Sequence, residues 1–490
     1  MSTTHDLTAT QLRGAVAALL GEGHRVALVA GHEDDDCLRV VYVLVRAADD
    51  ARVELTIRVP KDRPVVPSLA DLDYGIGRFE RELHDLYGIT PEGHPLPARL
   101  VRHAHWPSGW YPMRRDAGPA PAFEPDVGSF PFVEVEGDGV YEIPVGPVHA
   151  GLIEPGHFRF SVVGETILRM KARLWFVHRG VEKLFEGQPV QDGIALAELI
   201  SGDTAVGHAI AYAVAVEGAL GIEIAEQDRL IRAVLLELER LHNHVADLGA
   251  LANDVGYGIA NAHAQTIRES LLRLNKQVTG HRLLRGGISV GGAHVLDLPP
   301  AAEITSVAHR VAEVVDICLS NSTVLDRFTG TAVLPGEQAR GLGVLGYVAR
   351  ASGIDVDARR DHPIADLPGL EVVVEHGGDV LARYLVRARE VQASAHLLTD
   401  LLLRLAGETG SGSVRRATGG RAGIGLAGGW RGTIAHRVEI GTDGRISRVK
   451  VVDPSFFNWP ALPVALADTI VPDFPLANKS FNQSYAGNDL

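Results

Sequence analysis

The chain has 490 residues, of which 46% are hydrophobic and 22% are charged, a composition typical of globular proteins with large buried cores. Its formal net charge of -14 at pH 7, without a basic tract, disfavours nucleic acid and anionic lipid surfaces as partners. The two cysteines, Cys37 and Cys318, lie far apart in the sequence. This excludes a disulfide framework and a cysteine-built zinc or iron–sulfur site, and it is typical of a reducing cytoplasm.

The N-terminal region predicts a small α+β domain over residues 1–116. The first twenty residues lack the basic segment of a signal peptide and predict an amphipathic helix. Residues 38–47 and 51–60 alternate between apolar and polar side chains, which indicates two strands. Residues 117–140 are rich in Pro, Gly and Asp and show no periodicity, so we interpret them as a linker.

Residues 141–490 predict a second, mainly helical domain. Apolar residues at helical spacing predict helices at 192–220, 224–251, 261–283, 302–327 and 379–406, and strands are expected near 141–147 and 157–170. Asp443-Gly444 predicts a hairpin turn near the C-terminal end. The most apolar segment, residues 209–222, is interrupted by Glu217, so no membrane span is expected. The predicted fold class is therefore α+β, a small α+β domain followed by a helical bundle with β ribbons.

Two motifs suggest ligand sites but lack the structural context that such sites need. Residues 423–428, "GIGLAG", have the glycine spacing of a phosphate-binding loop, but no helix is expected to follow them. We interpret residues 407–429 as a glycine-rich loop. His242 and His244 are two positions apart on a predicted helix, so they point in different directions and cannot share a metal ion. We expect one of them to face the core or a partner and the other to face water.

A polar stretch, "LISGDTAVGHAIAY" at residues 199–212, interrupts the helical pattern and lies among several motifs of one family. In chain order these motifs are "IPVGPVHAGLIEPGHFRF", "FVHRGVEKL", "DRLIRAVLLELERLHNHVADLG" and "FNWPAL". They resemble the large subunit of the energy-converting, formate hydrogenlyase-type [NiFe]-hydrogenases of group 4. They also resemble its complex I homologue, the quinone-cavity subunit of NADH:quinone oxidoreductase. Residues 1–116, through "FERELHDLYGI" and "WYPMRRD", resemble the small hydrophilic complex I subunit that is often fused ahead of it.

The resemblance implies that the metal ligands of the hydrogenases have been lost. The family's four cysteine positions fall on Ser201, Thr204, Ser484 and Gly487. Hydroxyls and a glycine cannot replace four thiolates as ligands of nickel and iron. We therefore expect no [NiFe] centre and no other cofactor bound by this chain, while the complex I resemblance implies a quinone as ligand. The family's quinone-facing tyrosine and cluster-facing arginine fall on Gly202 and Leu199, which weighs against quinone reduction.

The same resemblance implies a site at which Asp203, His208, His149, Arg179 and Glu182 converge. A carboxylate beside an imidazole in an apolar pocket can act as a proton relay, and we expect Asp203 and His208 to play these roles. The alternative is structural: Asp203, with Ser201 and Thr204, caps a helix that begins near Ala205. Arg179 and Glu182, in the same alternative, form a plain buried ion pair.

These observations lead to one functional hypothesis and one alternative. In the first, the chain is a peripheral-arm subunit of a complex I-like assembly, in which electrons pass to a quinone or similar acceptor and drive ion translocation. The expected partners are an iron–sulfur subunit and membrane antiporter-like subunits, which would hold this chain on the cytoplasmic side of the membrane. The alternative is a redox-silent subunit that serves only for docking. An independent enzyme is disfavoured, because no nucleophile or metal constellation supports one.

Overall fold

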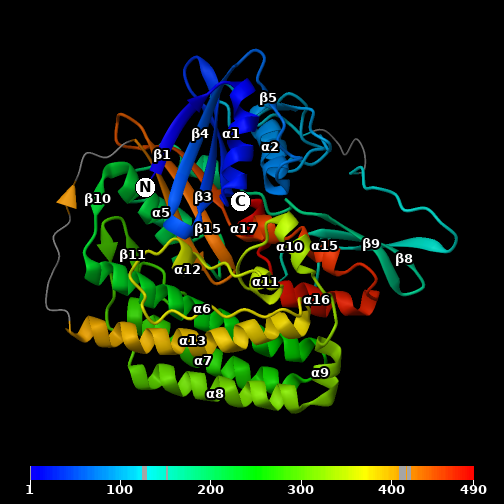
Figure 1. Cartoon of the computed structure of the whole chain (residues 1–490), viewed down its shortest axis with the longest axis vertical. Helices are drawn as coiled ribbons and strands as arrows, with labels where there is room; N and C mark the ends of the chain where they lie inside the picture. Colours follow the sequence, from blue (N-terminus) through cyan, green and yellow to red (C-terminus); the bar gives the residue numbers. More distant parts are fainter. Residues whose placement is uncertain (1, 124–129, 151–152, 408–414, 417–420) are drawn as a thin grey trace.

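The N-terminal part of the protein, residues 2–116, is a sheet with helices packed beside it (Figure 1). The computed structural model describes residues 2–123, 130–150, 153–407, 415–416 and 421–490. The sheet has the order β1-β4-β3-β2, in which β1 pairs parallel with β4 and the other neighbours pair antiparallel. Its strands are β1 (Ser2–Leu7), β2 (Arg25–Glu33), β3 (Cys37–Arg46) and β4 (Ala51–Pro60). The other elements are α1 (Ala9–Gly21), η1 (Ala47–Asp49), β5 (Val65–Pro67), α2 (Tyr74–Tyr87) and β6 (Thr90–Glu92).

Long helices form the opposite end of the molecule, as predicted for the second domain (Figure 1). They are α6 (Glu226–Asp254), α7 (Gly258–Thr279), α8 (Ala301–Ser320) and α13 (Val380–Gly407), while the fifth long helix, α5 (Ala205–Leu220), lies between them and the N-terminal part. The shorter helices are α3 (Val181–Phe185), α4 (Gly193–Ala197), α9 (Ser322–Phe328), α10 (Gly336–Leu342), α11 (Gly346–Ala351), α12 (Ala358–Asp361), α14 (Ser455–Asn458), α15 (Ala461–Ala465), η2 (Val471–Asp473), α16 (Phe474–Phe481) and α17 (Tyr485–Asp489). Among the described residues, no helix is long and apolar enough to cross a bilayer.

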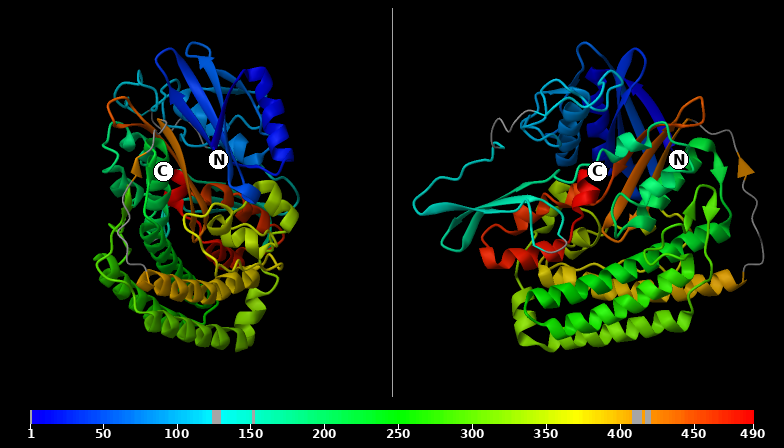
Figure 2. Two further views of the ribbon diagram at one scale, coloured as in Figure 1. Left: turned by 60° about the vertical axis from the view of Figure 1, so that its left-hand side comes forward. Right: turned by 180° about the vertical axis from the view of Figure 1, so that it is seen from behind.

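Two three-stranded antiparallel sheets complete this part. One is a ribbon that projects from the body and consists of β7 (Val140–Val145), β8 (His157–Val163) and β9 (Thr166–Arg173) (Figure 2). The other consists of β14 (Ala422–Gly429), β15 (Gly432–Ile440) and β16 (Ile446–Val452), and helix α5 packs against it. The minor strands are β10 (Ile222–Glu223), β11 (Ile288–Ser289), β12 (Gly292–Ala293) and β13 (Arg415–Arg416).

Three expectations about secondary structure were wrong in part. The helix expected after a Thr/Asp start forms as α1, which begins after Thr8, but the preceding residues Ser2–Leu7 form strand β1, because β4 offers them a parallel partner. The helix expected at 192–220 is divided into α4 and α5, because the polar stretch separates them. Residues 422–429 of the expected loop form strand β14, whereas 408–414 and 417–420 lie outside the described residues.

The glycines of "GIGLAG" serve close packing rather than phosphate binding. A Cβ atom on Gly425 would lie 1.9 Å from the carbonyl oxygen of Ala211 in α5, and one on Gly423 would lie 2.1 Å from that of Ala215. Only glycine leaves room for the backbone of β14 to approach that of α5 so closely. The glycine pattern therefore fixes the position of α5, whose N-terminal end holds the polar stretch.

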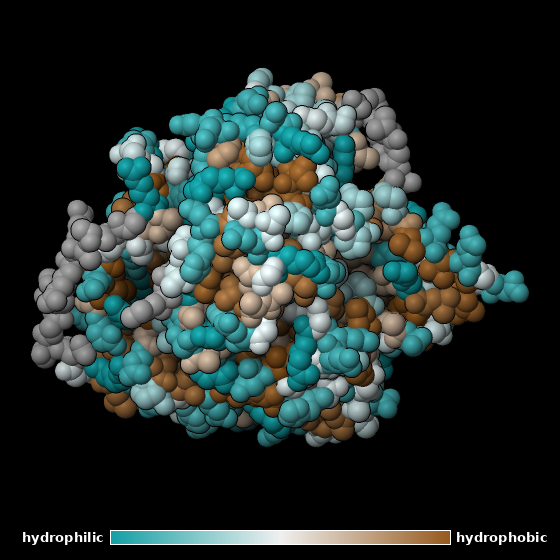
Figure 3. All heavy atoms as spheres, turned by 45° about the horizontal axis from the view of Figure 1, so that its top comes forward, coloured by the Kyte–Doolittle hydropathy of each residue, from teal (hydrophilic) through white to brown (hydrophobic). Residues whose placement is uncertain are grey.

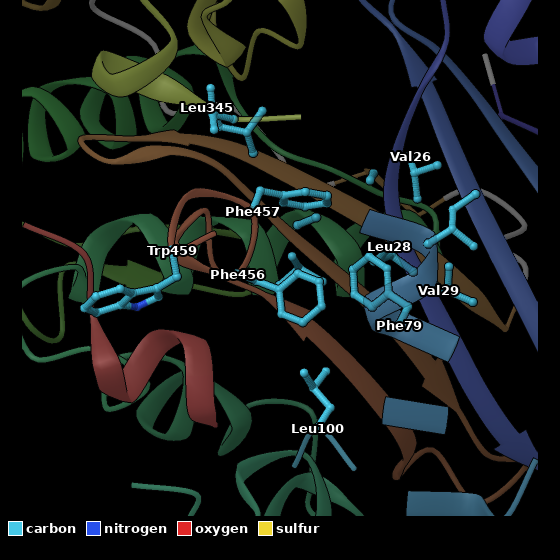
Figure 4. Packing of buried hydrophobic residues seen from close by; sticks show 14 of the residues in the cluster. Val26, Leu28, Val29, Phe79, Leu100, Leu345, Phe456, Phe457 and Trp459 are labelled. Atoms are coloured by element: carbon cyan, nitrogen blue, oxygen red, sulfur yellow. The ribbon is translucent and has the colours of Figure 1, made fainter. Parts of the chain in front are cut away.

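One hydrophobic cluster joins the N-terminal part to the ribbon and the C-terminal segments of the second part (Figure 4), while the long helices pack around a second cluster. The ring of Phe79 in α2 stacks on that of Phe456 in α14, with centroids 4.4 Å apart. Ion pairs also connect the two parts: Arg437 on β15 donates to Glu54 on β4 at 2.9 Å, and Arg39 on β3 donates to Glu439 on β15 at 2.8 Å. The shared cluster includes Phe481 and Tyr485 near the C-terminus, whereas Leu490 is buried in the second cluster.

The close approach of β14 to α5 generates a stability prediction. Gly425→Ala places a methyl group into a backbone carbonyl, so we expect the free energy of unfolding to fall by about 3 kcal/mol. The matched control is Gly14→Ala on the exposed face of α1, where nothing lies within 4 Å of the added Cβ atom. That control should gain about 0.5–1 kcal/mol. Thermal and urea unfolding of the purified chain measure both, and equal midpoints for Gly425→Ala and the wild type would contradict this account.

Candidate functional site

The positions of the four lost ligands meet near the start of α5, and their polar groups bond to one another. Ser201 and Ser484, which are 283 positions apart, have their hydroxyl oxygens 2.8 Å from each other. The Ser484 hydroxyl also accepts from the backbone N–H of Gly487 at 2.9 Å, so it caps α17. Thr204 donates its hydroxyl to Asp203 at 2.9 Å and accepts from the Trp430 indole at 3.1 Å. These hydroxyls are therefore engaged in the protein's own hydrogen bonds.

Asp453 occupies the space beside the fourth position. A Cβ atom on Gly487 would lie 2.6 Å from the carboxyl carbon of Asp453, so no side chain fits at residue 487 while Asp453 is present. The carboxylate of Asp453 is fully buried and accepts from the backbone N–H of Ser455 at 2.7 Å. A carboxylate thus fills part of the region into which a cysteine at residue 487 would project.

Asp203 forms an ion pair with Arg431, which lies in the turn between β14 and β15. The two guanidinium nitrogens donate to the two carboxylate oxygens at 2.6 and 2.7 Å. Burial alone would raise the pKa of Asp203, but the charge and hydrogen bonds of Arg431 hold that pKa well below its usual range. Asp203 is therefore an ionised anchor for Arg431, and it cannot carry protons near neutral pH.

The expectation that Asp203 caps α5 was wrong. The N-cap residue is Thr204, whose side chain makes no capping bond, and the first free N–H groups of the helix are satisfied from elsewhere. Glu239 of α6 accepts from the backbone N–H groups of Val206 at 2.7 Å and Gly207 at 3.1 Å. Burial raises the pKa of Glu239 to about 8. A cap supplied by a distant helix leaves no local sequence signal, which is why the sequence pointed to Asp203 instead.

His208 does not pair with Asp203, so the predicted relay between these two residues was also wrong. Its Nε2 atom lies 3.0 Å from Asp453 Oδ2, and its Nδ1 atom lies 3.0 Å from Nε2 of His436. Burial would raise the pKa of Asp453, but the hydrogen bond and charge of His208 lower it. Burial also lowers the pKa of His436 well below its usual value. The residues that form a buried line are thus Asp453, His208 and His436, and neither Asp453 nor His436 was predicted.

A polar cavity of about 840 Å³ lies in front of the converging positions. Asp203 and His149 line it, as do Ser201, Ser484 and Arg431. The Nε2 atom of His149 lies 2.8 Å from the carbonyl oxygen of Gly156 in the base of the ribbon. Two of the five predicted site residues therefore line this cavity, while His208 is buried behind it.

Arg179 and Glu182 line a different, more apolar cavity of about 360 Å³, and the expected ion pair between them does not form. Arg179 donates to the carbonyl oxygens of Leu199 at 3.0 Å and Ile200 at 2.7 Å, so it anchors the start of the polar stretch. Glu182 accepts from Arg448 at 2.7 Å, and although burial opposes it, the charges of Arg448 and Lys450 lower its pKa to about 2. Because α3 begins only at Val181, the two residues do not share a helix face.

His242 and His244 are both buried, so the expectation that one faces water was wrong. His244 lies 2.8 Å from Glu390 on α13. Glu390 also accepts from Arg350 and Arg359, so the histidine belongs to a buried ionic network between α6, α11, α12 and α13. Among the residues that the structure describes, no group of three or more His, Cys, Asp or Glu side chains is arranged to hold a metal ion.

Tyr485 and Gln483 are the cavity residues that sequence reasoning missed. Both line the 840 Å³ cavity, and within the described structure the Tyr485 hydroxyl and the Gln483 carbonyl oxygen are buried without hydrogen-bond partners. Burial raises the pKa of Tyr485 to about 12, so its hydroxyl keeps its proton at physiological pH. A buried polar group without a partner is unusual in a folded protein and indicates a place where a ligand can bind. Their proximity to Ser484 in the sequence was the one available signal.

Three known protein families match successive stretches of the chain. Residues 6–122 match "Respiratory-chain NADH dehydrogenase, 30 Kd subunit", and residues 254–418 match the 49 Kd subunit of the same enzyme. The stretch between them, residues 179–252, matches "Nickel-dependent hydrogenase". This last stretch contains two of the four lost ligand positions, Ser201 and Thr204.

Individual proteins extend this similarity over most of the chain. Formate hydrogenlyase subunit 5 of Escherichia coli is 33% identical over 465 residues, which cover 92% of this chain and 81% of that protein. The fused C/D subunit of NADH-quinone oxidoreductase from Bacteroides thetaiotaomicron is 30% identical over 398 residues, or 74% of each chain. A solved chain from the membrane-bound sulfane sulfur reductase, an archaeal respiratory membrane complex, superimposes with a TM-score of 0.64. It is 25% identical and covers 72% of this chain and 99% of that one.

The buried cap of α5 generates a pH-dependent prediction. The pKa of Glu239 in the folded protein, about 8, exceeds its usual value near 4.5, so this residue stabilises the fold most at low pH. That contribution should decline as the pH rises from about 5 through 8, by about 4 kcal/mol. Glu239→Gln should lack this decline, while Glu313→Gln on the exposed face of α8 should keep it. Urea unfolding at several pH values measures the difference, and identical pH profiles for the wild type and Glu239→Gln would contradict the assignment.

Proposed function

The chain belongs to the family of subunits that join a 30 kDa-like N-terminal domain to a 49 kDa- and hydrogenase-like domain, and from this membership we propose its function. It is a peripheral-arm subunit of a complex I-like assembly, related to energy-converting hydrogenases. In this assembly electrons pass to a quinone or a similar acceptor in the 840 Å³ cavity, without a [NiFe] centre. The observation that carries this proposal is the cavity itself, which lies where the lost ligands meet and holds polar groups without partners.

The residues at the four positions do not fit a [NiFe] centre. Nickel and iron require soft, anionic donors, whereas Ser201, Thr204 and Ser484 offer neutral hydroxyls and Gly487 offers no donor. The hydroxyls of Ser201 and Ser484 bond to each other, and Asp453 fills the space beside Gly487. The chemistry of this subunit therefore does not pass through a bimetallic centre.

The cavity offers the groups that reduction of a carbonyl acceptor needs. Reduction of a quinone consumes protons as well as electrons, so a donor must lie beside the acceptor oxygen. Tyr485 lines the cavity and its hydroxyl keeps its proton, so we assign this donor role to Tyr485, although the family's tyrosine position is Gly202. A Cβ atom on Gly202 would meet nothing within 4 Å, which leaves room for the acceptor. Arg431 also lines the cavity, where its charge is balanced by the ion pair with Asp203.

The projecting ribbon supports the proposed contact with other subunits. Figure 3 shows hydrophobic residues gathered near the right-hand edge of the molecule, where the ribbon projects. On the ribbon, Tyr141, Val163 and Leu168 are 50%, 42% and 41% exposed. Exposed apolar side chains on a projecting ribbon are typical of a surface that a partner covers. We assign this surface to the iron–sulfur subunit that supplies electrons. Membrane antiporter-like subunits then hold the assembly on the cytoplasmic side of the membrane.

Removal of the Tyr485 hydroxyl tests the proposed proton donor. Because that hydroxyl has no partner in the described structure, Tyr485→Phe should raise the stability of the subunit by about 1–3 kcal/mol or leave it unchanged. We expect its acceptor-linked turnover in the intact complex to fall about 100-fold, the usual contribution of a positioned proton donor. The assay is reduction of a water-soluble quinone by reduced methyl viologen, and Tyr74→Phe, an exposed tyrosine of α2, is the matched control.

The same assay separates the proposed function from a docking role. Asp203→Asn leaves the buried charge of Arg431 without its partner, so turnover should fall at least tenfold while the complex still assembles. Unchanged turnover in both Tyr485→Phe and Asp203→Asn would leave only the redox-silent docking role.

Elemental analysis of the purified subunit tests the absence of the bimetallic centre directly. We expect less than one nickel per chain, because no thiolate is present at the four positions. Stoichiometric nickel together with iron would overturn this part of the proposal.

A further inference from the structure

A third cavity, of about 790 Å³, lies between the end of the N-terminal part and the ribbon. It shares no lining residue with the acceptor cavity. Its walls come from residues 98–106, residues 130–132, strands β8 and β9, and the segment 175–178 that follows β9. Two features of these walls, their charge and their aromatic content, distinguish the cavity from the rest of the molecule.

The charge of this cavity is positive in a protein whose net charge is -14. Four arginines line it, Arg99, Arg102, Arg159 and Arg173, and none of the described lining residues is an aspartate or glutamate. Two of them have carboxylate partners outside the lining: Arg159 lies 3.3 Å from Glu142, and Arg102 lies 3.6 Å from Asp85. Arg99 and Arg173 donate, within the described structure, only to backbone carbonyl oxygens. The charges of these last two are thus not neutralised by direct ion pairs.

Arg173 bears most of the energetic cost of this arrangement. It is 4% exposed, and burial lowers its pKa to about 10, so the side chain is still charged at neutral pH. Neighbouring His103 adds no charge, because burial and Arg173 lower its pKa to about 4. A buried cation without a directly bonded anion is unfavourable, and binding an anion in the adjoining cavity would offset that penalty.

Aromatic side chains form much of the remaining wall. They are Trp106, Phe130, Phe132, Trp175 and Phe176. The guanidinium of Arg173 lies 4.6 Å from the ring centre of Phe130, and that of Arg159 lies 4.9 Å from the ring centre of Phe132. A ligand with a flat aromatic ring can stack on these guanidinium groups and rings. An anionic group on the same ligand would then contact the arginines.

We propose that this cavity binds a small organic anion, a phosphate or carboxylate, that carries a flat aromatic ring. The anionic group lies among Arg99, Arg159 and Arg173, and the ring stacks on the aromatic wall. Nothing in this assignment depends on electron transfer in the acceptor cavity.

The test separates the contributions of charge and ring. Calorimetric titration of the full-length chain is carried out with 1-naphthyl phosphate, which has both groups, with inorganic phosphate, and with 1-naphthol. We expect 1-naphthyl phosphate to bind at least tenfold more tightly than either of the others, and its affinity to fall as salt is added. Equal affinity for 1-naphthyl phosphate and 1-naphthol would overturn the role of the arginines, and equal affinity for the two phosphates would overturn the role of the ring.

Substitutions of the lining arginines test whether 1-naphthyl phosphate binds in this cavity. The double variant Arg99→Gln/Arg159→Gln should weaken 1-naphthyl phosphate binding at least tenfold, because each charge-assisted hydrogen bond contributes about that factor. Arg13→Gln, whose arginine is exposed on α1 and paired with Asp71, is the matched control and should bind as the wild type does. Binding by the double variant that equals wild-type binding would overturn the assignment.

Discussion

The ion pair between Asp203 and Arg431 is the interaction on which the geometry of the acceptor cavity depends. It joins the polar stretch before α5 to the turn between β14 and β15, and Arg431 also donates to the carbonyl oxygen of Asn482 at 2.6 Å. One guanidinium thus fixes three segments that are distant in the sequence. Because the Arg431 side chain is only 3% exposed, loss of Asp203 would leave a buried charge, and loss of Arg431 would remove the link between these segments.

Hydrogen bonds hold together the polar interior around this pair, at the positions to which the family resemblance assigns metal ligands. In the hydrogenase-like arrangement four thiolates and a bimetallic centre would hold the start of α5 to the C-terminal segment. Here the hydroxyl contact between Ser201 and Ser484 makes that connection, and Glu239 satisfies the first turn of α5. Each bond of this kind contributes only about 1 kcal/mol, so the segments also need the shared core and the glycine-lined contact of β14 with α5.

Sequence patterns predicted the long helices. A helix that buries one face has apolar residues at helical spacing, whichever element packs against that face. These patterns did not predict β1 or β14, because a strand forms only where another strand pairs with it. The glycines of β14 are explained only by the close approach of α5 to this strand. Site residues show the same division. Asp203 and His149 were found through local motifs, whereas Arg431, Asp453 and Tyr485 reach the site through contacts that span most of the chain.

The polar atoms of Tyr485 and Gln483 that lack hydrogen-bond partners help to decide whether the subunit takes part in electron transfer or serves only for docking. A buried hydroxyl without a partner costs about 1–3 kcal/mol, and a phenylalanine in place of Tyr485 would avoid that cost. In a subunit that served only for docking, such a replacement would be favourable for stability and neutral for function. The four former ligand positions have lost their thiolates and formed satisfied hydrogen bonds, yet the adjoining Tyr485 and Gln483 keep unsatisfied polar atoms. A cavity that has abandoned metal binding but still holds unsatisfied polar atoms is better explained by a bound acceptor than by decay of the site.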